Sequence, residues 1–148
     1  MQRQKLRTAL TVCAAAALAA VVPASTSAGA ASPPPEPDPV VVDCFFDPQV
    51  RPDDFILACG DGNNRLVDLR WTSWGPTFAE ARGTDLVNDC QPYCAVGKFH
   101  AYPVTVKLDR PKPWKKDPNQ EHYTRMRLVY SHDKPAQAKQ EESFKLWD

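Results

Sequence analysis

Residues 65–74 read Arg-Leu-Val-Asp-Leu-Arg-Trp-Thr-Ser-Trp, and this stretch alternates between apolar and polar side chains. In an extended chain one face carries Val67, Leu69 and Trp71, and the intervening polar residues lie on the other face. A half-buried β-strand has this period of two residues. The stretch therefore predicts a strand with Trp71 in the core and Trp74 on the opposite face.

The same kind of pattern recurs on both sides of this stretch. Residues 55–59 form a short apolar run, and residues 102–108 and 126–130 alternate clearly between apolar and other side chains. Residues 60–64 and 75–76 supply glycine, asparagine and proline for turns. Several short strands with no helical period between them predict an all-β fold, a small antiparallel sandwich or barrel of five to seven strands.

The N-terminus has the three parts of a secretory signal. Basic residues precede position 8, residues 9–22 are almost wholly apolar, and small residues lead up to Ala30. We expect cleavage near Ala30, which removes residues 1–30 and releases a secreted, extracellular protein. The apolar run is shorter than the roughly 20 residues that span a bilayer, so we expect no stable membrane anchor.

The remaining chain divides into three parts by composition. Residues 31–39 are rich in proline, which cannot continue a helix or a central strand, and they predict an extended linker. Residues 40–131 carry the strand pattern and predict one β domain. Residues 132–148 predict a C-terminal tail that is partly helical or disordered. The alternative for this tail is that its apolar end, residues 144–147, docks on the domain.

Charge excludes one class of partner. The chain has 18 basic and 18 acidic residues. Removing residues 1–30 takes away three basic residues and no acidic one, which leaves 15 basic against 18 acidic residues and a formal charge of −3. Nucleic-acid binding needs clustered positive charge, so this balance predicts no nucleic-acid partner.

Four cysteines remain after the signal: Cys44, Cys59, Cys90 and Cys94. An even number in a small exported protein predicts a disulfide framework, for which three connectivities are possible. We favour Cys44–Cys59 and Cys90–Cys94, because the members of each pair are near in sequence. A four-cysteine zinc site needs close pairs on both sides, which this spacing lacks, so we expect no metal.

Five residues are candidates for ligand binding. On the non-apolar strand face Trp74 would form an aromatic platform for a sugar ring or a peptide, unless it only caps the strand end. Tyr93 lies in the short Cys90–Cys94 loop and would be displayed to a partner. Trp114, Lys115 and Lys116 lie in a proline-rich basic loop that would touch an anionic polymer at the cell surface, although a solvated hairpin loop has the same composition.

Catalytic chemistry is weakly indicated. His100 and His122 would lie near each other if the last two strands pair, but a hydrolase also needs a nucleophile and an orienting acid within reach. No local signature supports Ser73 or a nearby aspartate in these roles. We therefore assign no catalytic residue and expect no cofactor.

Two segments carry a family resemblance. Residues 71–75, Trp-Thr-Ser-Trp-Gly, and residues 88–97, Asn-Asp-Cys-Gln-Pro-Tyr-Cys-Ala-Val-Gly, resemble a group of small secreted actinobacterial proteins. The resemblance covers about residues 44–130 and implies secretion in a Gram-positive setting, but it supplies no catalytic residues. In size and disulfide plan alone, the chain is also similar to the subtilisin-inhibitor and neocarzinostatin types.

Three functions remain open at this point. The first is a secreted, non-enzymatic binding or surface-interaction domain, whose partner would be a cell-wall polymer or another secreted protein. The second is a protease-inhibitor-like protein that presents a disulfide-fixed loop. The third is a small hydrolase that uses His100 or His122.

Overall fold

The computed structural model describes residues 37–147 of the 148-residue chain. In chain order the strands are β1 (Val41–Val42), β2 (Pro48–Gln49), β3 (Phe55–Ile56), β4 (Asn64–Trp74), β5 (Phe78–Asn88), β6 (Phe99–Pro113), β7 (Glu121–Tyr130) and β8 (Glu141–Lys145). The described residues contain no helix, and the predicted all-β fold is confirmed. The predicted signal, residues 1–30, and residues 31–36 of the predicted linker lie outside the described residues.

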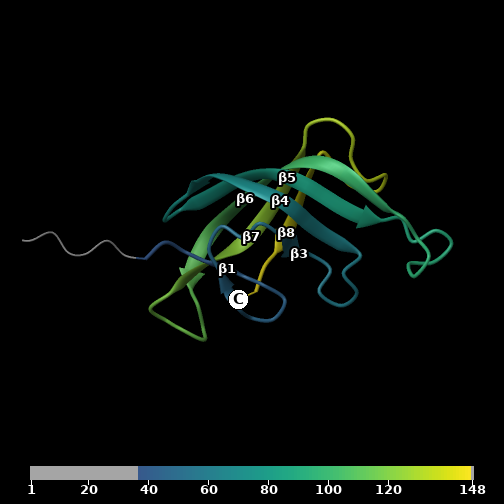
Figure 1. The fold of residues 1–148 in the computed structure, drawn as a ribbon. Helices are drawn as coiled ribbons and strands as arrows, with labels where there is room; N and C mark the ends of the chain where they lie inside the picture. Colours follow the sequence, from purple (N-terminus) through teal and green to yellow (C-terminus); the bar gives the residue numbers. More distant parts are fainter. Residues whose placement is uncertain (1–36, 148) are drawn as a thin grey trace, which may run out of the picture. The chain divides into compact units, whose positions relative to one another are not determined.

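Six strands form one antiparallel sheet in the order β3-β4-β5-β6-β7-β8, so each strand pairs with its neighbour along the chain. Figure 1 shows that the strands of this sheet are strongly curved. The predicted alternation is confirmed in residues 104–108 of β6 and residues 126–130 of β7, because buried side chains recur there at every second position. These side chains are Val104, Val106 and Leu108 of β6 and Met126, Leu128 and Tyr130 of β7.

The small β1–β2 sheet lies against β7. Val40 forms a parallel bridge with His122, and its backbone N–H donates to Glu121 O at 2.9 Å. Val41 is fully buried in the same core cluster as the buried side chains of β6 and β7. The first described residues therefore belong to the folded domain and cover part of its core.

Two irregularities in the β4–β5 pairing decide which side chains of β4 face the core. Val67 pairs with Thr84 and Arg70 with Arg82, so β4 has one extra residue there; a second extra residue, Thr72, follows. Each β-bulge reverses the inward and outward alternation. Leu66, Leu69 and Trp74 therefore all become buried, and Trp71 packs partly buried against the same core.

Gly83 is needed at the first bulge because the backbones approach closely. An added Cβ at Gly83 would lie 2.8 Å from Leu69 Cδ2 and 2.9 Å from Val67 O. Asp68, in the bulge itself, has a positive φ of 54°, a conformation that aspartate tolerates better than most residues. Gly83 and Asp68 thus accommodate a bulge that the alternation of apolar and polar residues does not predict.

Residues 141–145 of the C-terminal tail form strand β8, and the described residues of the tail contain no helix, so the prediction of partial helix is wrong. β8 pairs antiparallel with β7, with Phe144 opposite Met126. Phe144 and Leu146 pack against the core, and Trp147 Nε1 donates to Asp43 O at 3.0 Å. The open edge of β7 supplies hydrogen-bond partners that an isolated tail lacks, which favours the docked alternative.

Candidate functional site

The loop of residues 89–98, which joins β5 to β6, is the candidate site. Cys90 and Cys94 form a disulfide within it, and their Cα atoms are 3.7 Å apart. Cys44 and Cys59 form the second disulfide, with Cα atoms 5.4 Å apart, so both predicted pairs are confirmed. Residues 91–96 of the 89–98 loop are all exposed. The loop is thus covalently closed, and its residues 91–96 are accessible.

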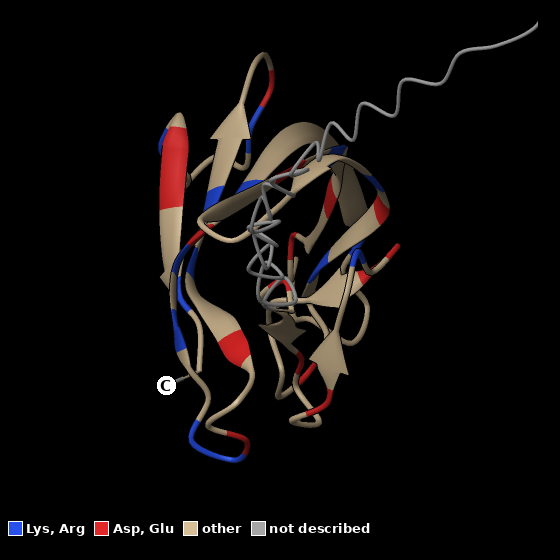
Figure 2. Cartoon of the chain, turned by 90° about the vertical axis from the view of Figure 1, so that its left-hand side faces the viewer, with Lys and Arg blue, Asp and Glu red and all other residues tan. Residues whose placement is uncertain are grey.

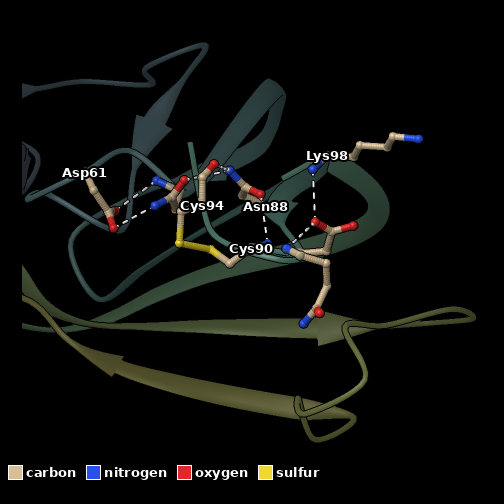
Figure 3. The surroundings of a disulfide bond; sticks show 8 residues. Asp61, Asn88, Cys90, Cys94 and Lys98 are labelled. Atoms are coloured by element: carbon tan, nitrogen blue, oxygen red, sulfur yellow. Dashed lines mark hydrogen bonds between the residues drawn. A yellow bond between two sulfur atoms is a disulfide. The ribbon is translucent and has the colours of Figure 1, made fainter. Parts of the chain in front are cut away.

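Asn88 fastens the 89–98 loop to the turn before β4 (Figure 3). Its Oδ1 accepts from Cys90 N–H at 2.9 Å, and its Nδ2 donates to Cys94 O and to Asn63 Oδ1, each at 2.8 Å. Asn63 in turn donates its backbone and side-chain N–H groups to Asp61, and these bonds lower the pKa of Asp61. The two ends of the disulfide are therefore held from one side chain.

The position of the Asn88 side chain also requires a glycine at residue 97. An added Cβ at Gly97 would collide with Asn88 Oδ1 and would lie 2.8 Å from Cys90 N. Gly97 N–H also donates to Tyr93 O at 3.1 Å, which closes the turn of the loop. The close approach of Gly97 to Asn88 thus depends on the absence of a side chain.

Asp89 organises the base of the 89–98 loop. Its Oδ1 accepts from the backbone N–H groups of Gln91 at 3.0 Å and Lys98 at 2.9 Å, and its Oδ2 lies 2.9 Å from His100 Nε2. The His100 hydrogen bond, followed by the two backbone hydrogen bonds, lowers the pKa of Asp89 to about 2. Asp89 is therefore ionised throughout the ordinary pH range and holds both ends of the loop together.

Acidification should loosen the loop in a defined pH window. Because the folded-state pKa of Asp89 lies below its ordinary value of 3.8, its contribution is present above about pH 4 and is lost as pH falls toward about 2. We expect hydrogen-exchange protection of the Gln91 and Lys98 amides to fall over that window. Asp89→Ala should remove this protection at every pH.

Asp117 provides the matched control for this measurement. It is an exposed aspartate that accepts a backbone N–H, from Asn119 at 3.1 Å, in the distant β6–β7 hairpin. Asp117→Ala should leave the Gln91 and Lys98 amides as protected as in the unmodified protein. Equal protection in Asp89→Ala would show that the disulfide and the hydrogen bonds of Asn88 order the loop without Asp89.

The loop presents apolar side chains on this fixed backbone. Tyr93 is 60% exposed and Val96 is 52% exposed, and Val96 N–H donates to Tyr93 O at 3.1 Å within one turn. Phe99, the first residue of β6, is also exposed, and the Arg65 guanidinium carbon lies 4.9 Å from its ring centroid. Tyr93 therefore has Val96 as an exposed apolar neighbour, which the sequence pattern did not indicate.

Trp74 does not form a binding platform, and that prediction is wrong. Trp74 is only 8% exposed, since the bulge at Thr72 turns its side chain into the core. Its Nε1–H donates to Pro39 O at 2.8 Å. Every part of the indole that a ligand would need is thus covered.

Trp114 is also buried, contrary to the prediction. It is 8% exposed and packs with Val40 and Val42, because β1 folds back over the β6–β7 hairpin. Lys115 and Lys116 are exposed, and Lys116 Nζ lies 4.6 Å from the Phe46 ring centroid and 5.7 Å from that of Trp114. The basic part of the loop remains accessible, whereas its tryptophan is structural.

The two histidines are not brought together. His100 pairs with Val87, and His122 pairs with Lys112. His100 and Lys112 are twelve residues apart along β6, a strand length of about 40 Å at ~3.3 Å per residue. His122 is buried, whereas His100 is exposed beside Asp89. The expected proximity of the histidines is therefore wrong, and of the two only His100 is accessible, with Asp89 as its acid partner.

Asp85 is a buried acid that the strand pattern did not reveal. It has no exposed surface, and its Oδ2 accepts from the Tyr130 hydroxyl at 2.7 Å. Burial raises the pKa of Asp85, and burial together with Asp85 raises the pKa of Tyr130. The pair lies within the core, where it positions Tyr130 and is closed to a ligand.

Comparisons with known proteins do not assign this site. No family model, curated protein or solved structure matches the chain. The resemblance carried by residues 71–75 and 88–97 therefore stays a prediction.

Among residues 37–147, no helix is long and apolar enough to cross a membrane. The two disulfides are compatible with an extracellular protein.

Proposed function

We propose that the chain is a secreted, non-enzymatic binding domain that recognises another secreted protein through its 89–98 loop. The observation that carries this proposal is the exposed pair of Tyr93 and Val96 on a backbone closed by the Cys90–Cys94 disulfide and fastened by Asn88 and Asp89. A preorganised loop loses little conformational entropy on binding. Exposed tyrosine is a residue type that often dominates binding energy at protein interfaces.

The shape of the loop favours general protein recognition over protease inhibition. An inhibitor loop that enters a protease cleft must run extended, so that the protease can pair with its backbone. Here residues 94–96 form a turn, and the N–H groups of Val96 and Gly97 both donate to Tyr93 O. The loop is exposed and well tethered, as an inhibitor loop would be, but its backbone is folded on itself.

Binding to a secreted partner should depend on Tyr93. We expect Tyr93→Ala to weaken the complex by about 30-fold or more, the effect of a hot-spot residue, and Val96→Ala to weaken it less. The partner is captured on immobilised protein from culture supernatant, purified, and titrated by calorimetry. Support requires a defined stoichiometry with the purified partner, since capture alone does not establish recognition.

Phe78→Ala is the control variant. Phe78 is 54% exposed, similar to Tyr93, but it begins β5, at the far end of that strand from the loop. Its replacement should leave affinity unchanged. A purified partner that binds Tyr93→Ala and Val96→Ala as tightly as the unmodified protein would refute the proposal, as would the absence of any binding protein in the supernatant. Capture and inhibition of a protease would favour the inhibitor alternative.

A further inference from the structure

A basic groove of about 480 Å³ lies on strands β6, β7 and β8, beside the β6–β7 hairpin. It is lined by Arg110, Lys112, Thr124, Arg125, Ser143 and Lys145. Figure 2 shows Lys and Arg positions recurring along neighbouring strands and at the tip of the hairpin below them. The groove is thus positively charged, in a chain whose overall formal charge is zero.

Acidic residues neutralise only part of this charge. Asp109 accepts two hydrogen bonds from Arg125, at 2.6 and 2.8 Å, and one from Arg127 at 3.2 Å. Arg127 also donates to Glu141 at 3.2 Å. These two arginines and two acids balance each other. Within residues 37–147, Arg110 and Lys112 form no ion pair, so their charge is available to a ligand.

The backbone of β6 turns Arg110 toward the groove. Asp109 lies opposite Arg125, so both side chains lie on the same face of the sheet. In a regular strand Arg110 would then point to the other face. Instead Arg110 has a positive φ of 57°, its carbonyl oxygen accepts from the Thr124 hydroxyl at 2.7 Å, and its side chain lines the groove beside Arg125.

This reversal also places Lys112 on the groove face. Pro111 pairs with Tyr123, which is fully buried, so the alternation sends Lys112 to the outer face. Lys112 indeed lines the same groove. One backbone irregularity therefore places both Arg110 and Lys112 of β6 beside the ion-paired Arg125.

We propose that this groove binds a polymer chain, other than a nucleic acid, that carries repeated phosphate groups. Arginine and lysine next to the Ser143 hydroxyl are donors suited to phosphate oxygens. Lys115 and Lys116 extend the exposed positive charge from the groove to the hairpin tip, about 10 Å beyond Lys112 at ~3.3 Å per residue. A single anion would occupy one part of this length, whereas a chain of anions would follow it.

This site is separate from the proposed protein-recognition loop. The 89–98 loop precedes β6, whereas Arg110 and Lys112 lie near the other end of the same strand. About 11 residues separate them, roughly 35 Å along the strand. The domain would therefore hold a phosphate-bearing polymer at one end and a protein at the other, and substitutions at either site should leave the other site intact.

Labelled polyphosphate is the probe for this proposal. At about 50 mM salt we expect the unmodified protein to bind it, with an affinity that falls as salt rises. The double variant Arg110→Gln, Lys112→Gln should bind about tenfold more weakly and with a smaller salt dependence, because both quantities decrease with the number of phosphates that the protein neutralises. Inorganic phosphate at the same phosphate concentration should not displace the polymer.

Arg70→Gln, Arg82→Gln is the matched control, since it removes the same charge from an exposed pair on β4 and β5. An equal decrease in affinity in this control would show diffuse attraction and overturn the proposal. So would failure of polyphosphate to bind, displacement by inorganic phosphate, or equally tight binding of heparin or polyglutamate. If the groove variant does not fold, amide shifts of the unmodified protein decide: polyphosphate must perturb residues 110, 112 and 143–145, and not the amides of residues 89–98.

Discussion

Replacing Trp74 with alanine should lower the free energy of unfolding by about 3–5 kcal/mol, the usual cost of deleting a large buried aromatic side chain. Trp74 is buried, and its ring contacts Trp71 and Tyr123 edge-on, with centroid distances of 4.5 and 5.5 Å. Its Nε1–H also satisfies Pro39 O, so the substitution leaves a cavity and an unpaired carbonyl. Urea unfolding followed by circular dichroism measures this decrease.

One further variant separates the contributions of Trp74, and one at Trp147 serves as a control. Trp74→Phe keeps much of the volume but removes the N–H, and should cost about 1–3 kcal/mol through the unpaired Pro39 carbonyl. Trp147→Ala changes a side chain that is 38% exposed and should cost less than Trp74→Ala. If Trp74→Ala destabilised the protein no more than Trp147→Ala, the burial of Trp74 in the core would be incorrect.

The sequence pattern succeeds where a strand is regular and fails where it is not. In residues 104–108 of β6 and residues 126–130 of β7 the side chains that alternate in sequence also alternate between core and surface, so these segments were predictable. In β4 a strict period of two placed Trp74 outside. The bulges at Asp68 and Thr72 each reverse which face of the sheet the following side chains occupy, and only the pairing with β5 reveals them.

The tail and the first strand depended on partners elsewhere in the chain. Residues 141–145 are polar and helix-permissive in isolation, but the free edge of β7 stabilises them as a strand. Likewise, β1 covers Trp114, a contact between residues more than 70 positions apart. Local propensity contains no information on such contacts, so neither outcome followed from the residues alone.

The candidate site was predictable in part. The two disulfides and the display of Tyr93 followed from the spacing of the cysteines and the proline between them. Asn88 and Asp89 carried a signal that could have been used, because these residue types commonly accept backbone N–H groups two residues ahead. The basic groove was predictable only in part, because the basic segment beside Trp114 is visible in the sequence but the groove combines three strands and an irregular φ at Arg110.

Removing the Cys44–Cys59 disulfide, with Cys44→Ala and Cys59→Ala together, should lower the free energy of unfolding by about 3 kcal/mol in the chain-entropy model. The bond closes a loop that contains β2 and β3, and it ties the β1–β2 sheet to the edge strand of the large sheet. Without it, that region is still held by the burial of Val41 and Phe55 in the core, by the contact of Val40 with β7 and by the hydrogen bond of Trp147 to Asp43 O. The core alternation of β6 and β7 does not involve the bond, so the domain should still fold.

The variant Cys90→Ala, Cys94→Ala gives the comparison that tests this reasoning. Its loop is much shorter, and the same model assigns it about 2 kcal/mol. Its main effect should instead be local, with greater exchange of the amides in the 89–98 loop and weaker partner binding. The Cys44–Cys59 variant should show the reverse, a lower unfolding midpoint with the 89–98 loop unchanged. A larger global destabilisation from the Cys90–Cys94 pair would mean that the 89–98 loop, through Asn88 and Asn63, supports the sheet rather than being displayed by it.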